Sequence, residues 1–133
     1  MDSPKCRILY AEDNEDTCFL ISTMLGQANI EVKCAMSASE ALQLAKTEHF
    51  DLYMLDTIFP DGDGVELCKQ LRVLDGHTPV VFYSGAAYDT DKRRALDAGA
   101  QAYLIKPDFE GVVETVSRLG CEETTVMQPT FLR

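Results

Sequence analysis

Apolar runs and amphipathic stretches alternate along the whole chain. The apolar runs are short and carry many β-branched or aromatic residues, which is typical of strands. They predict strands over Arg7–Ala11, Ile30–Ala35, Asp51–Leu55, Pro79–Tyr83 and Ala102–Ile105. Three of these runs are almost continuously apolar, as expected for strands that are buried on both faces.

The stretches between the runs carry apolar residues at helical spacing. In the first stretch, Phe19, Leu20 and Met24 belong to one apolar stripe. Ser37 or Ser39 is a suitable N-cap for the second. The spacing predicts helices over Glu15–Gln27, Ser39–Glu48, Gly64–Leu74, Thr90–Ala98 and Glu110–Leu119.

The regular alternation of strands and helices predicts an α/β fold in which a doubly wound parallel sheet has helices on both faces. The chain has 133 residues, a length that suits one domain with one hydrophobic core. The sequence contains no internal repeat and no linker rich in Gly, Ser or Pro. We therefore expect one domain over residues 1–120 and a loose C-terminal tail over residues 121–133.

The charge of the chain limits the partners that it can bind directly. There are 12 Lys and Arg residues against 22 Asp and Glu residues, so the formal net charge is −10. Such a chain repels phosphate backbones and anionic lipid, which predicts no direct binding of nucleic acid. The N-terminal residues do not resemble a signal peptide, and no apolar run approaches the ~18 residues of a membrane span. We expect a cytoplasmic protein without a membrane segment.

The five cysteines are widely spaced along the chain. They are Cys6, Cys18, Cys34, Cys68 and Cys121, an odd number with no Cys-x-x-Cys pair. This spacing indicates neither a zinc site nor a redox motif. In a cytoplasmic protein the cysteines are expected to be reduced structural thiols.

Chemically useful side chains follow the predicted strands. The first strand is followed by Glu12 and Asp13, the third by Asp56, the fourth by Ser84 and the fifth by Lys106. Ligands of an open parallel sheet bind beyond the carboxyl ends of its strands. Three carboxylates that meet there need a cation between them, and Mg²⁺ prefers such oxygen ligands. A lysine and a hydroxyl can hold the oxygens of a transferring phosphoryl group.

Longer motifs around these residues resemble the receiver domains of two-component response regulators, the CheY-like family. The resemblance covers about Lys5 to Leu119, with its motifs in the family's order. The motifs are Tyr10-Ala11-Glu12-Asp13, Asp56-Thr57-Ile58-Phe59-Pro60-Asp61-Gly62-Asp63-Gly64, Ser84-Gly85, Ala98-Gly99-Ala100 and Tyr103-Leu104-Ile105-Lys106-Pro107. Two departures from the family pattern are small. The family more often has Thr at position 84, where Ser keeps the hydroxyl, and Ala at position 85, where Gly only loosens the loop.

The resemblance implies a fold and a set of ligands. The fold would be flavodoxin-like, a (βα)5 arrangement with five helices and strand order 2-1-3-4-5. Asp56 would accept the phosphoryl group. Mg²⁺ would be held by Glu12, Asp13, Asp56 and the backbone carbonyl of Ile58. Lys106, which usually precedes proline through a cis peptide bond in this family, would contact the phosphoryl group.

The resemblance also implies partners and an output. The phosphoryl group would come from a phosphohistidine of a histidine kinase or of a histidine phosphotransfer protein. Ser84 would also contact the phosphoryl group, and with Tyr103 it would transmit the change to the surface of helix 4, strand 5 and helix 5. That surface would bind an output partner or a second copy of the chain. The protein would be no enzyme beyond its own phosphotransfer and self-dephosphorylation. We expect the self-dephosphorylation to be slow, because Ile58 and Ala86 cannot orient water.

Other interpretations of the same residues are weaker. A receiver-like adaptor that binds partners without phosphorylation remains the main alternative, although it has no need for the carboxylate cluster. A calcium loop that starts at Asp61 would need Glu at its twelfth position, where Arg72 stands. A haloacid-dehalogenase phosphatase would need a second Asp at position 58. His49 and His77 lie away from the carboxyl edge and are given no role.

Overall fold

A five-stranded parallel sheet forms the middle layer of the protein. The computed structural model describes residues 3–121. The strands of the sheet are β1 (Cys6–Ala11), β2 (Ile30–Ala35), β3 (Leu52–Leu55), β6 (Val80–Ser84) and β7 (Ala102–Ile105). Their order is β2-β1-β3-β6-β7, and each pair of neighbours is parallel. Since β6 and β7 are the fourth and fifth strands of this sheet, the predicted order 2-1-3-4-5 is confirmed.

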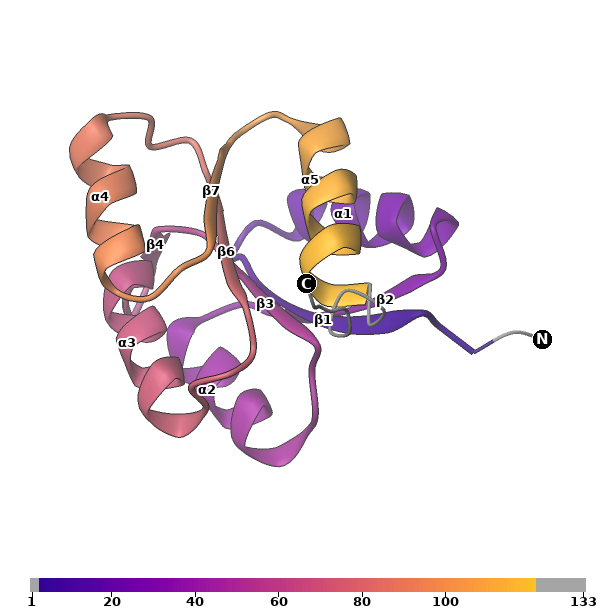
Figure 1. Ribbon diagram of the computed structural model, residues 1–133, viewed down its shortest axis with the longest axis horizontal. Helices are drawn as coiled ribbons and strands as arrows, with labels where there is room; N and C mark the ends of the chain where they lie inside the picture. The colour runs from indigo at the N-terminus through magenta and orange to yellow at the C-terminus, as the bar shows by residue number, and fades with distance from the viewer. Residues whose placement is uncertain (1–2, 122–133) are drawn as a thin grey trace, which may run out of the picture.

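Helices cover both faces of the sheet (Figure 1). They are α1 (Glu15–Gln27), α2 (Ala38–Thr47), α3 (Gly64–Leu74), α4 (Asp89–Asp97) and α5 (Phe109–Val116). Figure 1 shows α1 and α5 together on one side, and α2, α3 and α4 on the other. The doubly wound, flavodoxin-like α/β fold is therefore confirmed.

The core consists of two apolar layers, one on each face of the sheet. Along β3, Leu52 and Met54 belong to the layer beneath α1 and α5, whereas Tyr53 and Leu55 belong to the layer beneath α2, α3 and α4. Successive side chains of a strand point to opposite faces, so a strand covered on both sides must be apolar at every position. This burial explains the continuous apolar runs of the central strands.

The predicted elements agree with the observed ones to within a few residues, with two additions. A short antiparallel hairpin of β4 (Ile58–Phe59) and β5 (Gly62–Asp63) lies between β3 and α3. The final helix leaves the α-helical form after Val116 and ends in a π-helical turn, η1 (Ser117–Cys121). Of the expected loose tail, Cys121 belongs to this turn, and the remainder lies outside the described residues.

Side chains from the loops fix the starts of the helices. Asn14, Ser37, Asp63 and Asp108 cap α1, α2, α3 and α5 respectively, which decides between Ser37 and Ser39. Asp61, which is remote from α2 in the sequence, also contacts the start of that helix. One carboxylate oxygen accepts a 2.9 Å hydrogen bond from the backbone N–H of Ala38, and the other accepts a 2.9 Å bond from the N–H of Ser39. Asp61 thus ties the hairpin that follows Asp56 to a neighbouring helix.

The cysteines differ from expectation at one pair. Cys6 and Cys121, which are 115 positions apart in the sequence, form a disulfide with their Cα atoms 5.2 Å apart. The expectation of reduced thiols is wrong for this pair, because the fold brings the start of β1 beside the end of η1. Cys18, Cys34 and Cys68 are free.

Among residues 3–121, no helix is both long enough and apolar enough to cross a membrane.

Candidate functional site

Four parallel strands end at the same edge of the sheet and place the predicted site residues there. Glu12 and Asp13 follow β1, and Asp56 follows β3. The backbone N–H of Asp56 donates to the Ala11 carbonyl at 3.1 Å, which sets the ends of β1 and β3 level. The backbone N–H of Lys106, which follows β7, donates to the carbonyl of residue 84 at 2.8 Å. The sheet register therefore positions the site.

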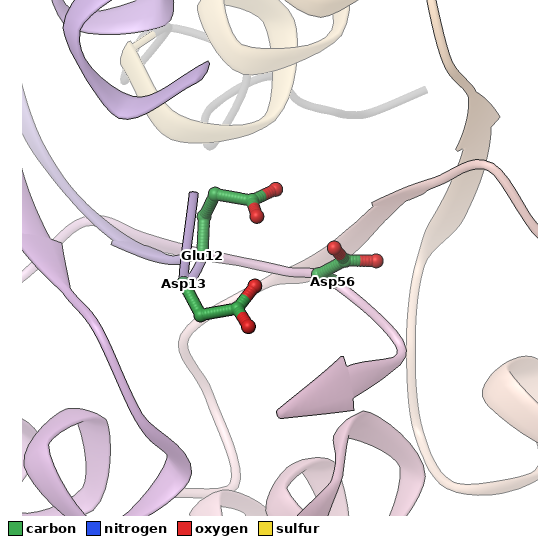
Figure 2. Close-up of side chains that lie close together, drawn as sticks. All are labelled: Glu12, Asp13 and Asp56. Atoms are coloured by element: carbon green, nitrogen blue, oxygen red, sulfur yellow. The ribbon is translucent and has the colours of Figure 1, made fainter. Parts of the chain in front are cut away.

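The three carboxylates form one cluster. Glu12, Asp13 and Asp56 each offer an oxygen, and these oxygens lie within 4.8 Å of one another. Figure 2 shows the three side chains directed into a common space. Glu12 is buried, with 2% of its surface exposed, whereas Asp13 is open to solvent and Asp56 is half-buried. Burial raises the pKa of Glu12, although a hydrogen bond from Lys106 opposes the rise.

Lys106 reaches into this cluster from the end of β7. Its Nζ lies 2.5 Å from Glu12 Oε1 and 3.1 Å from Asp56 Oδ2. Burial alone would lower the pKa of Lys106, but the hydrogen bond to Glu12 and the charge of Asp56 outweigh it and raise the pKa. The Lys106–Pro107 peptide bond is cis, as the family resemblance implies.

One ammonium group does not balance three carboxylates. The cluster keeps negative charge after Lys106 is counted, and its open side is formed by the exposed Asp13. A hard divalent cation with oxygen ligands suits such a set of donors, because it offsets the repulsion between the carboxylates. The residues present therefore fit Mg²⁺. Ile58, whose carbonyl is a predicted further ligand, begins β4 two residues after Asp56.

A chain of hydrogen bonds runs from the residue after Asp56 to Tyr103. The Ser84 hydroxyl, at the end of β6, shares a 2.8 Å hydrogen bond with the Thr57 hydroxyl and accepts a 3.1 Å bond from the backbone N–H of Ala86. The Tyr103 hydroxyl donates to the Ala86 carbonyl at 2.7 Å. The Tyr103 ring stacks on Phe82, with ring centroids 5.8 Å apart, and burial raises the pKa of its hydroxyl.

The predicted site residues form two groups of contacts, and sequence reasoning missed one residue of the second group. The structure brings together Glu12, Asp13, Asp56 and Lys106 through direct contacts. The separate chain of hydrogen bonds from Ser84 to Tyr103 includes Thr57, which sequence reasoning did not single out. The only sequence signal for Thr57 is a hydroxyl next to a candidate acceptor at the end of a strand.

Comparisons with known proteins agree with this geometry. The family model of the response regulator receiver domain matches residues 8–117. The alkaline phosphatase synthesis transcriptional regulatory protein PhoP of Bacillus subtilis is 36% identical over 101 residues, which are 76% of this chain and 42% of that protein. The response regulator ArlR of Staphylococcus saprophyticus is 31% identical over 111 residues, 83% of this chain and 50% of that protein. The chain spans about half the length of the curated relatives that it matches.

Solved structures show the same similarity along most of the chain. The receiver domain of the Francisella response regulator 1452 superposes with a TM-score of 0.81 at 30% identity, covering 86% of this chain and 95% of that one. A two-component response regulator from Clostridium difficile gives a TM-score of 0.82 at 30% identity, covering 86% and 94%.

Proposed function

Because this chain belongs to the response regulator receiver domain family, and is thus a phosphorylation-dependent signalling switch, we propose that Asp56 is the residue that accepts the phosphoryl group. One observation carries this assignment: Asp56 alone faces both the acidic cluster and Lys106 from a position that solvent reaches. Its Oδ1 accepts a 2.7 Å bond from the backbone N–H of Thr57, and its Oδ2 lies 3.1 Å from Lys106 Nζ. Glu12 contacts Lys106 as well, but it is buried.

The donor in this proposal is a phosphohistidine of a histidine kinase or of a histidine phosphotransfer protein. A carboxylate oxygen of Asp56 attacks the phosphorus, the P–O bond forms, and the P–N bond to the histidine breaks. The departing imidazole nitrogen keeps the electron pair of the broken bond and takes up a proton from water. The Lys106 ammonium stabilises the negative charge on the phosphoryl oxygens, because positioning and electrostatic stabilisation supply most of the catalysis in phosphoryl transfer.

The proposed metal ligands are the carboxylates of Glu12, Asp13 and Asp56 and the backbone carbonyl of Ile58. Bound Mg²⁺ would supply positive charge beside the incoming phosphoryl oxygens and offset the repulsion between them and the carboxylates. The side chains of this chain hold the acceptor in place. The Thr57 N–H fixes one oxygen of Asp56, while Lys106 contacts the other oxygen and Glu12.

The output in this proposal is a change at the face formed by α4, β7 and α5. Ser84 turns toward the phosphoryl group, and the Tyr103 side chain moves with the loop to which its hydroxyl is bonded. This face would bind an output partner or a second copy of the chain. The excess of acidic residues argues against direct contact with nucleic acid by this chain itself. An adaptor that is never phosphorylated would not need Lys106 between two carboxylates.

We expect phosphorylation to require Mg²⁺. The purified chain is incubated with a small acyl phosphate or phosphoramidate, and intact mass is measured with Mg²⁺ and with EDTA. One phosphoryl adduct is expected with Mg²⁺ and none with EDTA. Asp13→Ala should lose the adduct because it removes the exposed carboxylate of the proposed metal site. An adduct that forms equally in EDTA would contradict the metal site.

We also expect the phosphorylated state to decay slowly. Hydrolysis needs a water held in line with the phosphorus, and Ile58 and Ala86 line one pocket together with Thr57, the residue after Asp56. Neither side chain offers a hydrogen bond. Packing against the hairpin does not explain why residue 58 is apolar, because the Ile58 side chain is 72% exposed. Ile58→Asn or Ala86→Glu should speed decay by about tenfold, because each adds a group that can orient water.

Decay is followed by intact mass after the phosphodonor is removed, in buffer that contains Mg²⁺. Ile58→Val is the matched control, since it keeps the position apolar, and it should decay at the parent rate. A fast parent rate that neither polar substitution changes would rule out this explanation.

A further inference from the structure

The hydroxyl of Thr57 is bonded to the hydroxyl that must move when Asp56 is phosphorylated. Ser84 Oγ and Thr57 Oγ1 lie 2.8 Å apart. Ser84 is 1% exposed, so water does not compete for this contact. Within residues 3–121, no hydrogen bond joins Ser84 to Asp56, although both lie at the carboxyl edge of the sheet. Ser84 therefore rests in an orientation that Thr57 helps to set.

The Ser84 hydroxyl makes two hydrogen bonds in this orientation. A hydroxyl has one proton to donate and two lone pairs to accept with. The backbone N–H of Ala86 occupies one lone pair at 3.1 Å, and Thr57 takes either the proton or the other lone pair. A turn of the Ser84 side chain toward a phosphoryl oxygen on Asp56 would carry its hydroxyl away from Thr57 Oγ1. Thr57 therefore stabilises only the unphosphorylated arrangement.

The direction of the Thr57 side chain supports this separation of roles. Asp56 and Thr57 are successive residues in the segment that directly follows β3. Asp56 faces the acidic cluster, whereas Thr57 faces β6 and the loop after it. The backbone of Ala86 in that loop is bonded at two points, because its N–H donates to Ser84 Oγ and its carbonyl accepts from the Tyr103 hydroxyl.

We propose that Thr57 is a positioning residue that holds Ser84 in its unphosphorylated orientation and so sets how readily this receiver responds to a phosphoryl group. The proposal rests on the function proposed above, in which Asp56 is the acceptor. A contact made in only one of two states shifts the balance between them by the worth of that contact. A neutral hydrogen bond is worth about a three- to tenfold change in such an equilibrium.

Thr57→Val tests the proposal, because valine keeps the branched shape and removes the hydroxyl. The probe is beryllium trifluoride with Mg²⁺, which mimics the phosphoryl group on a carboxylate, and binding is followed by amide resonances. Thr57→Val should bind the probe about three- to tenfold more tightly than the parent. Thr57→Ser, which keeps the hydroxyl, should match the parent, and Thr57→Ala should behave like the valine variant.

A double-mutant cycle separates this role from a general structural one. In a Ser84→Ala background, Thr57→Val should no longer tighten binding, since the bond that it removes is already lost. Amide exchange in the unbound protein gives a second readout: the Ala86 N–H should exchange faster in Thr57→Val than in Thr57→Ser. Unchanged or weaker probe binding by both Thr57→Val and Thr57→Ala would overturn the proposal.

The outcome for the parent protein distinguishes the two proposals. If the parent binds the probe and the Thr57 variants do not bind it more tightly, only the role of Thr57 fails. If the parent does not bind the probe at all, the assignment of Asp56 fails, and the role of Thr57 fails with it.

Discussion

Asp56→Asn is expected to abolish acceptance of the phosphoryl group. Asparagine has nearly the same shape, and its side-chain oxygen can still accept the bond that the Thr57 N–H makes to Asp56 at 2.7 Å. The neutral amide is a far poorer nucleophile than the carboxylate and gives Lys106 no opposite charge at 3.1 Å. Intact mass after incubation with a small phosphodonor and Mg²⁺ should therefore show no adduct.

The matched control for this variant is Asp51→Asn. Asp51 directly precedes β3, at the opposite end from Asp56, and its carboxylate accepts a 2.8 Å bond from the backbone N–H of Arg7. An asparagine oxygen can keep that bond, so this variant should be phosphorylated like the parent. The assignment would be wrong if Asp56→Asn formed the adduct as fast as the parent, or if Asp51→Asn lost it.

The fold was predictable because burial on two faces leaves a plain pattern in the sequence. β3 is buried at all four positions, and β6 is buried at all five. Neither strand can alternate polar and apolar residues, so each gives a short continuous run between helical stretches. β2 lies at the edge of the sheet and is exposed at Glu31 and Lys33, yet Ile30 and Val32 still mark it as a strand.

The core of the candidate site was predictable for a topological reason. Parallel strands end at one edge, so Glu12, Asp13, Asp56 and Lys106 had to come near each other once the strands were assigned. The sequence could not give the distances that matter for chemistry. The approach of Lys106 Nζ to within 2.5 Å of Glu12 Oε1 depends on side-chain directions in the folded protein.

The features that sequence reasoning missed join segments that no local pattern relates. The disulfide between Cys6 and Cys121 depends on where the end of η1 lies against β1. The carboxylate of Asp61 reaches the start of α2, 22 and 23 positions away. The bond from Thr57 to Ser84 spans 27 positions. Each of these contacts is decided by tertiary packing, and periodicity contains no information about it.

Gly64→Ala is expected to damage both stability and phosphorylation. Gly64 is buried and begins α3, and its N–H donates to the Thr57 carbonyl at 2.8 Å. A Cβ at this position would meet the carbonyl oxygen of Asp56 more closely than real Cβ atoms approach any atom, and would lie 3.0 Å from Phe82 Cε2. The nearest obstacle is backbone, so α3 or the end of β3 must move.

The free energy of unfolding should fall by about 3 kcal/mol or more, because overpacking against backbone cannot be relieved by a change of rotamer. Phosphorylation of the folded fraction should slow by about 100-fold, since a shift of about 1 Å in a reacting group has that effect.

Gly26→Ala is the matched control. Gly26 lies in α1, where an added Cβ would meet nothing within 4 Å, so alanine should stabilise the protein by about 0.5 kcal/mol through its better helix propensity. Urea unfolding of both variants measures the two effects with opposite expected signs. If Gly64→Ala unfolds at the same urea concentration as the parent and is phosphorylated at the parent rate, the first turn of α3 does not hold Asp56 in place.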